Sequence, residues 1–296
     1  MSEARSRARV YALLGLMLLA WSANFIFVKV VVREIPPVLT FCFRTILSGV
    51  CMMPIYLLTR GRREAGTRAW TAADAPKLAA VGALGVVGNQ LLFVVGLSRT
   101  SVAHGAVITA LAPIFVLAGA AAMGVEPLTG RKLAGMATAV GGVRLLEAGR
   151  AQAGATVGGD LIMVASTMFL AAFTVFGKQL AANFGVIALN AFAFGGAAVL
   201  AAPATIAGVW KTDLSRVSAF AWVGVAYMAL VSSIAGYLIY SYALRRLPAS
   251  RVSSVTYFQP LAATLMAAAF LGENPGPTFA GATALVVGGV WVAERR

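Results

Sequence analysis

The sequence contains few charged side chains and very few acids. Its 296 residues include 10 Asp and Glu, 24 Lys and Arg and one His, so that 11% of the chain is charged, whereas soluble domains carry about 25%. No Asp or Glu falls in the central third of any apolar segment, which argues against an obligatory carboxylate proton carrier in a membrane. Two cysteines and one histidine are too few for a structural metal site. We therefore expect no metal and no cofactor.

The motifs of common enzymes are also missing. There is no G-x-x-x-x-G-K-[ST] loop for ATP, and the segment GVEPLTGRK has neither its spacing nor its terminal Ser or Thr. The sequence contains no H-E-x-x-H, no G-x-S-x-G and no buried pair of acids. Cys42 and Cys51 lie on one expected helix, about 13.5 Å apart along its axis, which is too far for a disulfide. We expect no catalytic residues and no enzymatic activity.

The sequence is instead strongly apolar. Hydrophobic residues make up 60% of it and the mean hydropathy is +0.85. A membrane-spanning helix needs about 20 apolar residues, so this composition predicts an all-α polytopic protein with about ten helices in a lipid bilayer. Apolar runs between Gly and Pro breakers predict helices over residues 10–31, 38–59, 76–97, 102–123, 131–147, 158–179, 185–208, 219–244, 250–271 and 278–294.

The net charge of +14 is compatible with an acidic partner or a nucleic acid, but its distribution indicates a membrane. With the N-terminus placed on the inner side, most Lys and Arg fall in short loops on that side, which is typical of cytoplasmic loops. This predicts two cytoplasmic termini, an even number of spans and no nucleic-acid partner. The apolar run after MSEARSRAR is longer than a signal-peptide core, so we expect a first span and not a cleaved leader.

The second half of the sequence repeats the first at an offset of 147 residues. The matched pairs are Pro113 and Pro260, Glu126 and Glu273, and Gly142 and Gly289. We therefore expect two repeats, residues 1–149 and 150–296, with five helices each. An odd number of spans in each repeat orients the two oppositely, and many secondary transporters build a midplane site from such an inverted pair.

Polar side chains deep in the expected spans mark a candidate site. Trp21 and Asn24 lie near mid-bilayer in the first helix, and Asn89 and Gln90 lie near the middle of the third. A buried amide is costly in lipid unless it faces a partner or a wet cavity. The alternative to a cavity is an interhelical hydrogen bond, worth about 0.6 kcal/mol on average. Because adjacent residues of a helix point about 100° apart, we expect one amide to face the cavity and the other to bond a neighbour.

The eighth and ninth helices add Tyr237, Tyr257 and Gln259, which lie too deep for an interfacial aromatic belt. A pocket of tyrosines and amides suits an amphipathic solute of modest size. The amides would orient ammonium and carboxylate groups, and the aromatic rings would pack an apolar side chain or hold a cation. Pro113 and Pro260 are expected to bend their helices and free backbone groups near the cavity.

Charged residues near the helix ends are interpreted as structural. His104 lies at the outer end of the fourth helix, so we expect a cap or a solvated residue more than a proton relay. Lys29 and Lys178 are expected to snorkel from the ends of their helices. Glu126 and Glu273 precede the fifth and tenth helices and favour their N-termini electrostatically.

These features resemble the drug/metabolite transporter superfamily, in its EamA branch of ten-helix bacterial exporters. The resemblance is carried by Trp21–Lys29 (WSANFIFVK), by Phe41–Arg44 (FCFR) and by the paired proline, glutamate-turn and Gly-Gly-Val blocks. It implies a bacterial inner-membrane protein, a basket of helices around a central cavity, and alternating access. Four-helix drug exporters of the superfamily carry a glutamate in the first helix, where this chain has the segment Trp21–Asn24. That difference argues against proton-coupled export of cationic drugs.

We therefore predict a secondary transporter, an exporter or uniporter, of small metabolites, with amino acids, aromatic ones included, as the preferred class. The alternative is an antiporter of phosphorylated sugars or other organic anions. It calls for at least two basic residues at mid-depth, and only Arg44, about 10 Å inside the second helix, approaches this. A membrane enzyme or receptor is disfavoured by the missing motifs and the duplication. The direction of flux, the coupling ion and the oligomeric state, with a monomer as one option, stay open. The predicted substrate-binding residues are Trp21, Asn24, Asn89, Gln90, Tyr237, Tyr257 and Gln259.

Overall fold

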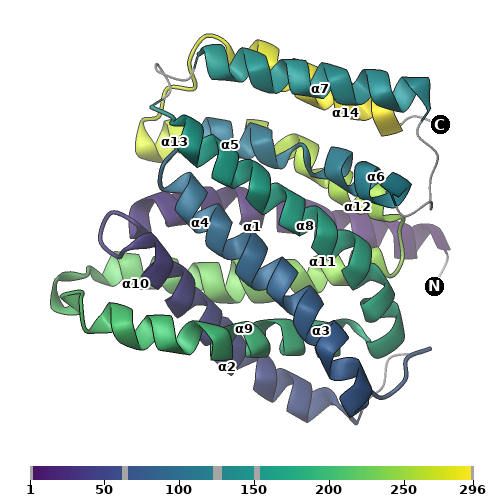
Figure 1. The fold of residues 1–296 in the computed structure, drawn as a ribbon, viewed down its shortest axis with the longest axis vertical. Coiled ribbons are helices and arrows are strands. Elements are labelled where there is room, and N and C mark those ends of the chain that lie inside the picture. Colours follow the sequence, from purple (N-terminus) through teal and green to yellow (C-terminus); the bar gives the residue numbers. More distant parts are fainter. Residues whose placement is uncertain (1–2, 62–65, 123–128, 150–153, 295–296) are drawn as a thin grey trace.

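The computed structural model describes residues 3–61, 66–122, 129–149 and 154–294. Within these ranges the chain forms helices and no strand (Figure 1), which confirms the all-α prediction. The helices are α1 (Glu3–Val31), α2 (Pro37–Thr59), η1 (Ala72–Asp74), α3 (Ala75–Gly82), η2 (Ala83–Leu91), α4 (Leu92–Leu97), α5 (Val102–Thr109), α6 (Ala112–Ala122), α7 (Gly130–Ala148), α8 (Val157–Phe184), α9 (Val186–Val209), η3 (Leu214–Arg216), α10 (Ala219–Tyr227), η4 (Met228–Ala235), α11 (Gly236–Leu244), α12 (Ala249–Ser253), η5 (Ser254–Phe258), α13 (Gln259–Leu271) and α14 (Phe279–Glu294).

Several of these segments join end to end, which gives the ten long helices that the sequence predicts. Segments α3, η2 and α4 form one helix, and α10, η4 and α11 form another. The pair α5 and α6 and the series α12, η5 and α13 do the same. In the described part of the chain, eight helices are long and apolar enough to cross a membrane, and α14 is a shorter apolar helix.

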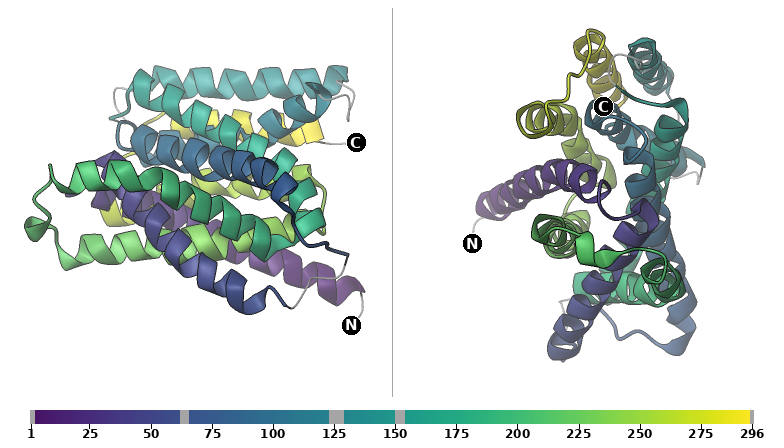
Figure 2. Two further views of the ribbon diagram at one scale, coloured as in Figure 1. Left: turned by 60° about the horizontal axis from the view of Figure 1, so that its bottom comes forward. Right: turned by 90° about the vertical axis from the view of Figure 1, so that its left-hand side faces the viewer.

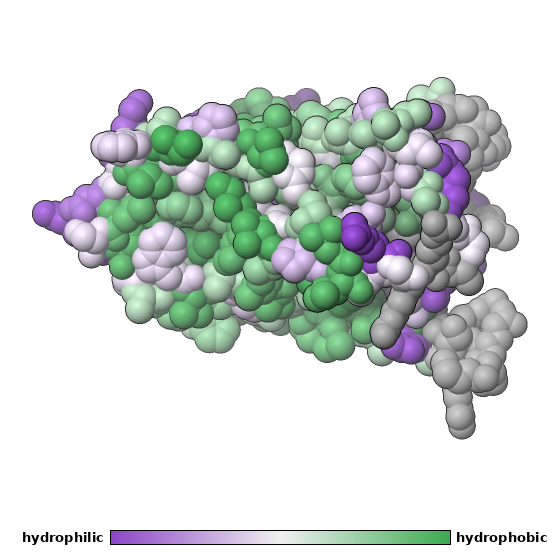
Figure 3. Space-filling model, turned by 90° about the horizontal axis from the view of Figure 1, so that it is seen from below, coloured by the Kyte–Doolittle hydropathy of each residue, from purple (hydrophilic) through white to green (hydrophobic). Residues whose placement is uncertain are grey.

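The outer surface of the helix bundle is apolar, as a bilayer requires. Large hydrophobic side chains such as Leu200, Leu265 and Phe270 are exposed, Phe270 to 76%. Figure 3 shows hydrophobic residues across the middle of one face and hydrophilic residues gathered toward its two ends. An apolar surface of this extent is not stable in water, and it fits contact with lipid.

The two ends of the chain lie at the same end of the bundle. Helix α1 begins and α14 ends on one side of the molecule, and the long helices cross between this side and the other (Figures 1 and 2). An even number of crossings brings the chain back to the side on which it started. The charge distribution of the loops predicted the same arrangement.

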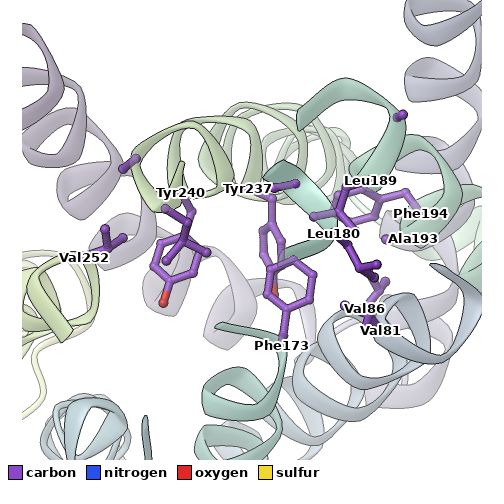
Figure 4. Packing of buried hydrophobic residues seen from close by; sticks show 14 of the residues in the cluster. Val81, Val86, Phe173, Leu180, Leu189, Ala193, Phe194, Tyr237, Tyr240 and Val252 are labelled. Atoms are coloured by element: carbon purple, nitrogen blue, oxygen red, sulfur yellow. The ribbon is translucent and has the colours of Figure 1, made fainter. Parts of the chain in front are cut away.

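Helices of the first half pack on helices of the second half. Helix α2 packs on α9, and α7 packs on α14, so that corresponding helices meet each other. Helix α1 packs on α10, η4 and α11, and α8 packs in the same manner on α4 and η2. Tyr237, Phe173 and Phe194 are part of a buried cluster that joins the first and second halves (Figure 4).

The paired glycines explain why α7 and α14 approach so closely. A Cβ on Gly142 would lie 2.9 Å from the backbone nitrogen of Val286, and a Cβ on Gly289 would lie 2.6 Å from that of Ala139. Val286 and Ala139 are themselves related by the offset of the repeat. The contact is therefore reciprocal. The glycine of each helix leaves room for the backbone of the other helix.

The helices that surround the centre are irregular at matched places. The third helix contains the π-helical segment η2, and the eighth contains the π-helical segment η4. The fourth helix is interrupted between α5 and α6, just before Pro113. The ninth changes from the 3-10 segment η5 to α13 just before Pro260. Proline lacks an N–H to donate to the carbonyl four residues earlier, and its ring crowds that carbonyl, which accounts for both interruptions.

Adding a methyl group at the glycine contact should loosen the α7–α14 pair. We expect Gly289→Ala to destabilise the protein by about 1–3 kcal/mol, the usual cost of overpacking, because backbone atoms cannot move aside easily. Gly288→Ala is the matched control, since its Cβ would meet no atom within 4 Å. Thermal unfolding in detergent measures both, and equal midpoints for the two variants would contradict the reciprocal contact.

Candidate functional site

A cavity lies among helices of both halves. Its walls come from α1, α2, η2, α4 and α5 of the first half and from α8, η4, α11 and α13 of the second half. The space inside it that the centre of a water molecule can reach measures about 50 Å³. The lining residues are Trp21, Asn24, Phe25, Arg44, Asn89, Gln90, Phe93, Thr109, Ser166, Thr167, Leu170, Ser232, Tyr237 and Gln259.

All but one of the predicted substrate-binding residues line this cavity. The exception is Tyr257, which is half-buried and packs on the apolar cluster around Val107 and Leu111. It lies in η5, where the 3-10 helix has three residues per turn in place of 3.6. Depth alone does not fix the direction of a side chain, and the ring of Tyr257 lies against this cluster and outside the cavity lining.

Some lining residues hold the π-helical segments together across the two halves. The Trp21 indole Nε1 donates to the carbonyl of Ser232 in η4 at 3.0 Å. The Tyr237 hydroxyl lies 3.0 Å from the carbonyl of Gly85 in η2 and 2.8 Å from Asn89 Oδ1. These bonds run between side chains of one half and the interrupted helix of the other.

The two adjacent amides divide their roles. Asn89 Nδ2 donates to the carbonyl of Ser166 at 3.0 Å and contacts its hydroxyl at 3.1 Å, so this side chain is tied to α8. Gln90 Oε1 accepts from the Ser233 hydroxyl at 3.3 Å, but its Nε2 has no hydrogen-bond partner among the described residues. Asn89 therefore positions the wall, and Gln90 presents a donor.

Two further buried amide oxygens of the cavity have no partner in the part of the chain that the structure describes. They are Asn24 Oδ1 on α1 and Gln259 Oε1 at the start of α13. A buried polar atom that makes no hydrogen bond costs about 1–3 kcal/mol. Several such atoms around one cavity indicate that water or a polar solute binds there.

Arg44 is the one lining residue of formal charge, and sequence reasoning left it out of the site. Its side chain is 2% exposed, and Nη2 donates to the Ser233 hydroxyl at 2.9 Å and to the Met228 carbonyl at 3.4 Å. Its Nε has no hydrogen-bond partner, and none of the described carboxylates forms an ion pair with it. The sequence feature that could have identified Arg44 was its depth in the second helix, because a charged side chain at that depth needs a partner or water.

Aromatic rings form the apolar part of the wall. The ring centroids of Trp21 and Tyr237 are 5.7 Å apart, and those of Phe25 and Phe93 are 4.9 Å apart with an edge-to-face arrangement. The ring of Phe173, which is not part of the lining, packs on Tyr237 with the ring centroids 5.4 Å apart. Figure 4 shows these two rings next to each other. Rings in such contact form a rigid surface against which an apolar group can pack.

The interpretation of His104 as a cap or a solvated residue was wrong. Its side chain is 1% exposed, and Nδ1 lies 2.9 Å from Asp160 Oδ2 on α8. The hydroxyl of Thr100 donates to the other carboxylate oxygen of Asp160. The imidazole faces into the bundle, where it makes this polar contact with the buried carboxylate of Asp160. Sequence reasoning missed Asp160 because it stands at a helix start, outside the central third.

Glu273 and the two lysines also have specific partners. Glu273 accepts from the backbone N–H of Val102 at 2.8 Å, so it stabilises the N-terminus of α5 and not that of the helix that follows it. Its other oxygen lies 3.9 Å from Lys29 Nζ. Lys178 donates to the Leu247 carbonyl at 3.1 Å. Both lysines therefore bind loop residues that follow other helices, where snorkelling was expected. Glu126 lies outside the described residues.

Comparison with known proteins adds the following. A model of the EamA-like transporter family matches the chain twice, over residues 9–147 and 157–294. An uncharacterized transporter of Archaeoglobus fulgidus is 22% identical over 98% of both chains. A probable terminal-alkyne amino-acid exporter of Streptantibioticus cattleyicolor is 27% identical over 78% of this chain and 77% of the relative. One crystal structure shares the fold, with a TM-score of 0.67, 18% identity and coverage of 97% of this chain and 96% of that one.

Removing the Tyr237 hydroxyl tests whether the cross-half bonds hold the cavity wall. Tyr237→Phe leaves the Gly85 carbonyl and Asn89 Oδ1 without this donor, so we expect a loss of stability of about 1–3 kcal/mol. Tyr242→Phe is the same chemical change at a half-buried ring on α11. Thermal unfolding in detergent compares them, and a Tyr237→Phe midpoint no lower than that of Tyr242→Phe would count against this role.

Proposed function

The chain belongs to the EamA-like transporter family, and on this premise we propose that it is a secondary transporter of amino acids, aromatic ones included. Members of the family are membrane transporters and not enzymes. The observation that carries the substrate class is the cavity, which combines unpaired amide atoms with a wall of aromatic rings. One relative is named as a probable amino-acid exporter, which supports the same class.

The transporter is built, in this proposal, from two inverted repeats, residues 1–149 and 150–296. The two family matches, the matched π-helical segments and the reciprocal contacts of Gly142 and Gly289 support it. The excess of basic residues in the loops on the side of the termini favours a cytoplasmic position for both ends. A bacterial inner membrane is the membrane that the resemblance implies.

Transport proceeds by alternating access, in which the two halves rock around the cavity. Four of the helices beside the cavity contain a π-helical, 3-10 or turn interruption, and such places absorb changes of backbone angle. Pro113 and Pro260 mark two of the interruptions. Glu273, with Val102 and Lys29, joins α13, α5 and α1 at one end of the bundle, where opening would separate them.

An antiporter of phosphorylated sugars or other organic anions is the second candidate, and Arg44 is the observation that favours it. A phosphate dianion is usually held by several cationic or N–H donors. Among the residues that line the cavity, Arg44 is the only Lys or Arg. A single guanidinium matches one carboxylate better than a phosphate, so we place amino acids first.

Flux into liposomes that contain the purified protein tests the proposal. We expect labelled phenylalanine or another amino acid to enter faster than into empty liposomes, at two pH values. Gln259→Leu removes a polar atom of the cavity and should raise the half-saturating concentration about 10-fold, equivalent to one hydrogen bond of roughly 1.4 kcal/mol. Gln179→Leu, on the exposed face of α8, should not. If no amino acid crosses faster than in empty liposomes, the proposed function is wrong.

A further inference from the structure

Arg44 is a buried cation without a counter-ion. It lies within the membrane-spanning part of α2 and is 2% exposed. Its contacts are neutral oxygens, those of Ser233 and Met228. An ionised group away from water is stable only when an opposite charge or several strong hydrogen bonds compensate it. None of the described carboxylates pairs with Arg44, and a bound anion would supply the compensating charge.

Arg44 lines the cavity and has one buried N–H group without a described acceptor. Arg44 and Gln90 both line it, and Arg44 Nε and Gln90 Nε2 are buried donors with no described acceptor. A hydrogen bond from a guanidinium to a carboxylate is charge-assisted and roughly twice as strong as one between neutral groups. Nη2 donates to Ser233 and Met228, which fixes the plane of the guanidinium and leaves the Nε–H as the donor for a carboxylate oxygen.

The rest of the cavity fits the other parts of an amino acid. Asn24 Oδ1 and Gln259 Oε1 are buried acceptors without a described donor, and an ammonium group has three donors to give. Trp21 and Tyr237 supply ring faces for an apolar side chain or for the cation itself. Donors for a carboxylate, acceptors for an ammonium and an apolar wall therefore occur together.

We propose that Arg44 is the carboxylate anchor of this site, so that the transporter selects solutes with a free carboxylate and rejects the corresponding amides and esters. This inference rests on the proposed function and narrows its substrate class. It also distinguishes an amino-acid transporter from a sugar-phosphate antiporter. One guanidinium, which is what the cavity lining has, is enough to bind a monocarboxylate. Phosphorylated sugars are disfavoured by the same argument, because a phosphate is usually held by several cationic or N–H donors.

Competition against labelled phenylalanine uptake in proteoliposomes tests the anchor with the unmodified protein. Phenylalaninamide keeps the ring and the ammonium but replaces the carboxylate by a neutral group. We expect it to compete at least about 100-fold more weakly than unlabelled phenylalanine, because a site built for a polar group strongly rejects an analogue that lacks it. Glucose 6-phosphate should not compete. Equal competition by phenylalanine and its amide would overturn the proposal while leaving the transport function in place.

Substitution adds a second test. Arg44→Gln should lower phenylalanine uptake about 100-fold and abolish the preference over the amide. Arg44→Lys should retain part of the preference, since it keeps the charge but loses the planar set of donors. Arg216→Gln, an exposed arginine paired with Asp213, is the control and should behave as the wild type. An unchanged preference in folded Arg44→Gln would also overturn the proposal.

Ligand binding to the detergent-purified protein tests the carboxylate anchor even if no amino acid is transported. A ligand that binds only the folded state raises the unfolding midpoint. We expect 3-phenylpropionate to raise it in the wild type and 3-phenylpropionamide to leave it unchanged at the same concentration. Stabilisation by neither compound, or equally by both, would refute the anchor. An absence of flux in the liposomes refutes the transport function alone.

Discussion

A backbone carbonyl inside a bilayer has to find a donor within the protein, and this requirement shapes the centre of the molecule. The π-helical segments η2 and η4 present carbonyls that side chains of other helices reach. The carbonyl of Gly85 accepts a hydrogen bond from Tyr237. The carbonyls of Ser232 and Met228 accept hydrogen bonds from Trp21 and Arg44, respectively. Each of these bonds joins the first half of the chain to the second. The residues that satisfy the irregular helices are also the walls of the cavity, so the site and the association of the halves depend on the same contacts.

Symmetry and its breaking have different uses here. The reciprocal contact of Gly142 and Gly289 treats both halves alike, and so does the pairing of α2 with α9. At the cavity the halves differ, because η2 supplies the amides Asn89 and Gln90 whereas η4 and α11 supply Ser232 and Tyr237. An exact repeat could not place donors at one side of a solute and acceptors at the other.

Much of this was predictable from hydropathy, breakers and the repeat. The ten helices follow from apolar length, and the deep amides Asn24, Asn89 and Gln90 reach the cavity because lipid offers them no alternative. Predictions failed where a side chain's direction depends on local helix geometry or on a distant partner. Tyr257 lies in the 3-10 segment η5, outside the cavity lining. His104 turned inward because Asp160 lies on another helix. Arg44 has no periodic signal, and only its depth marked it.

The central claim is that one cavity between the halves holds an amino acid by its carboxylate, its ammonium and its side chain. A structure determined by electron cryomicroscopy with phenylalanine bound tests it most directly. The account predicts the carboxylate within hydrogen-bond distance of Arg44, the ammonium at Asn24 or Gln259, and the ring against Trp21. Phenylalanine bound elsewhere in an active protein, or bound in the cavity with its carboxylate away from Arg44, would contradict it.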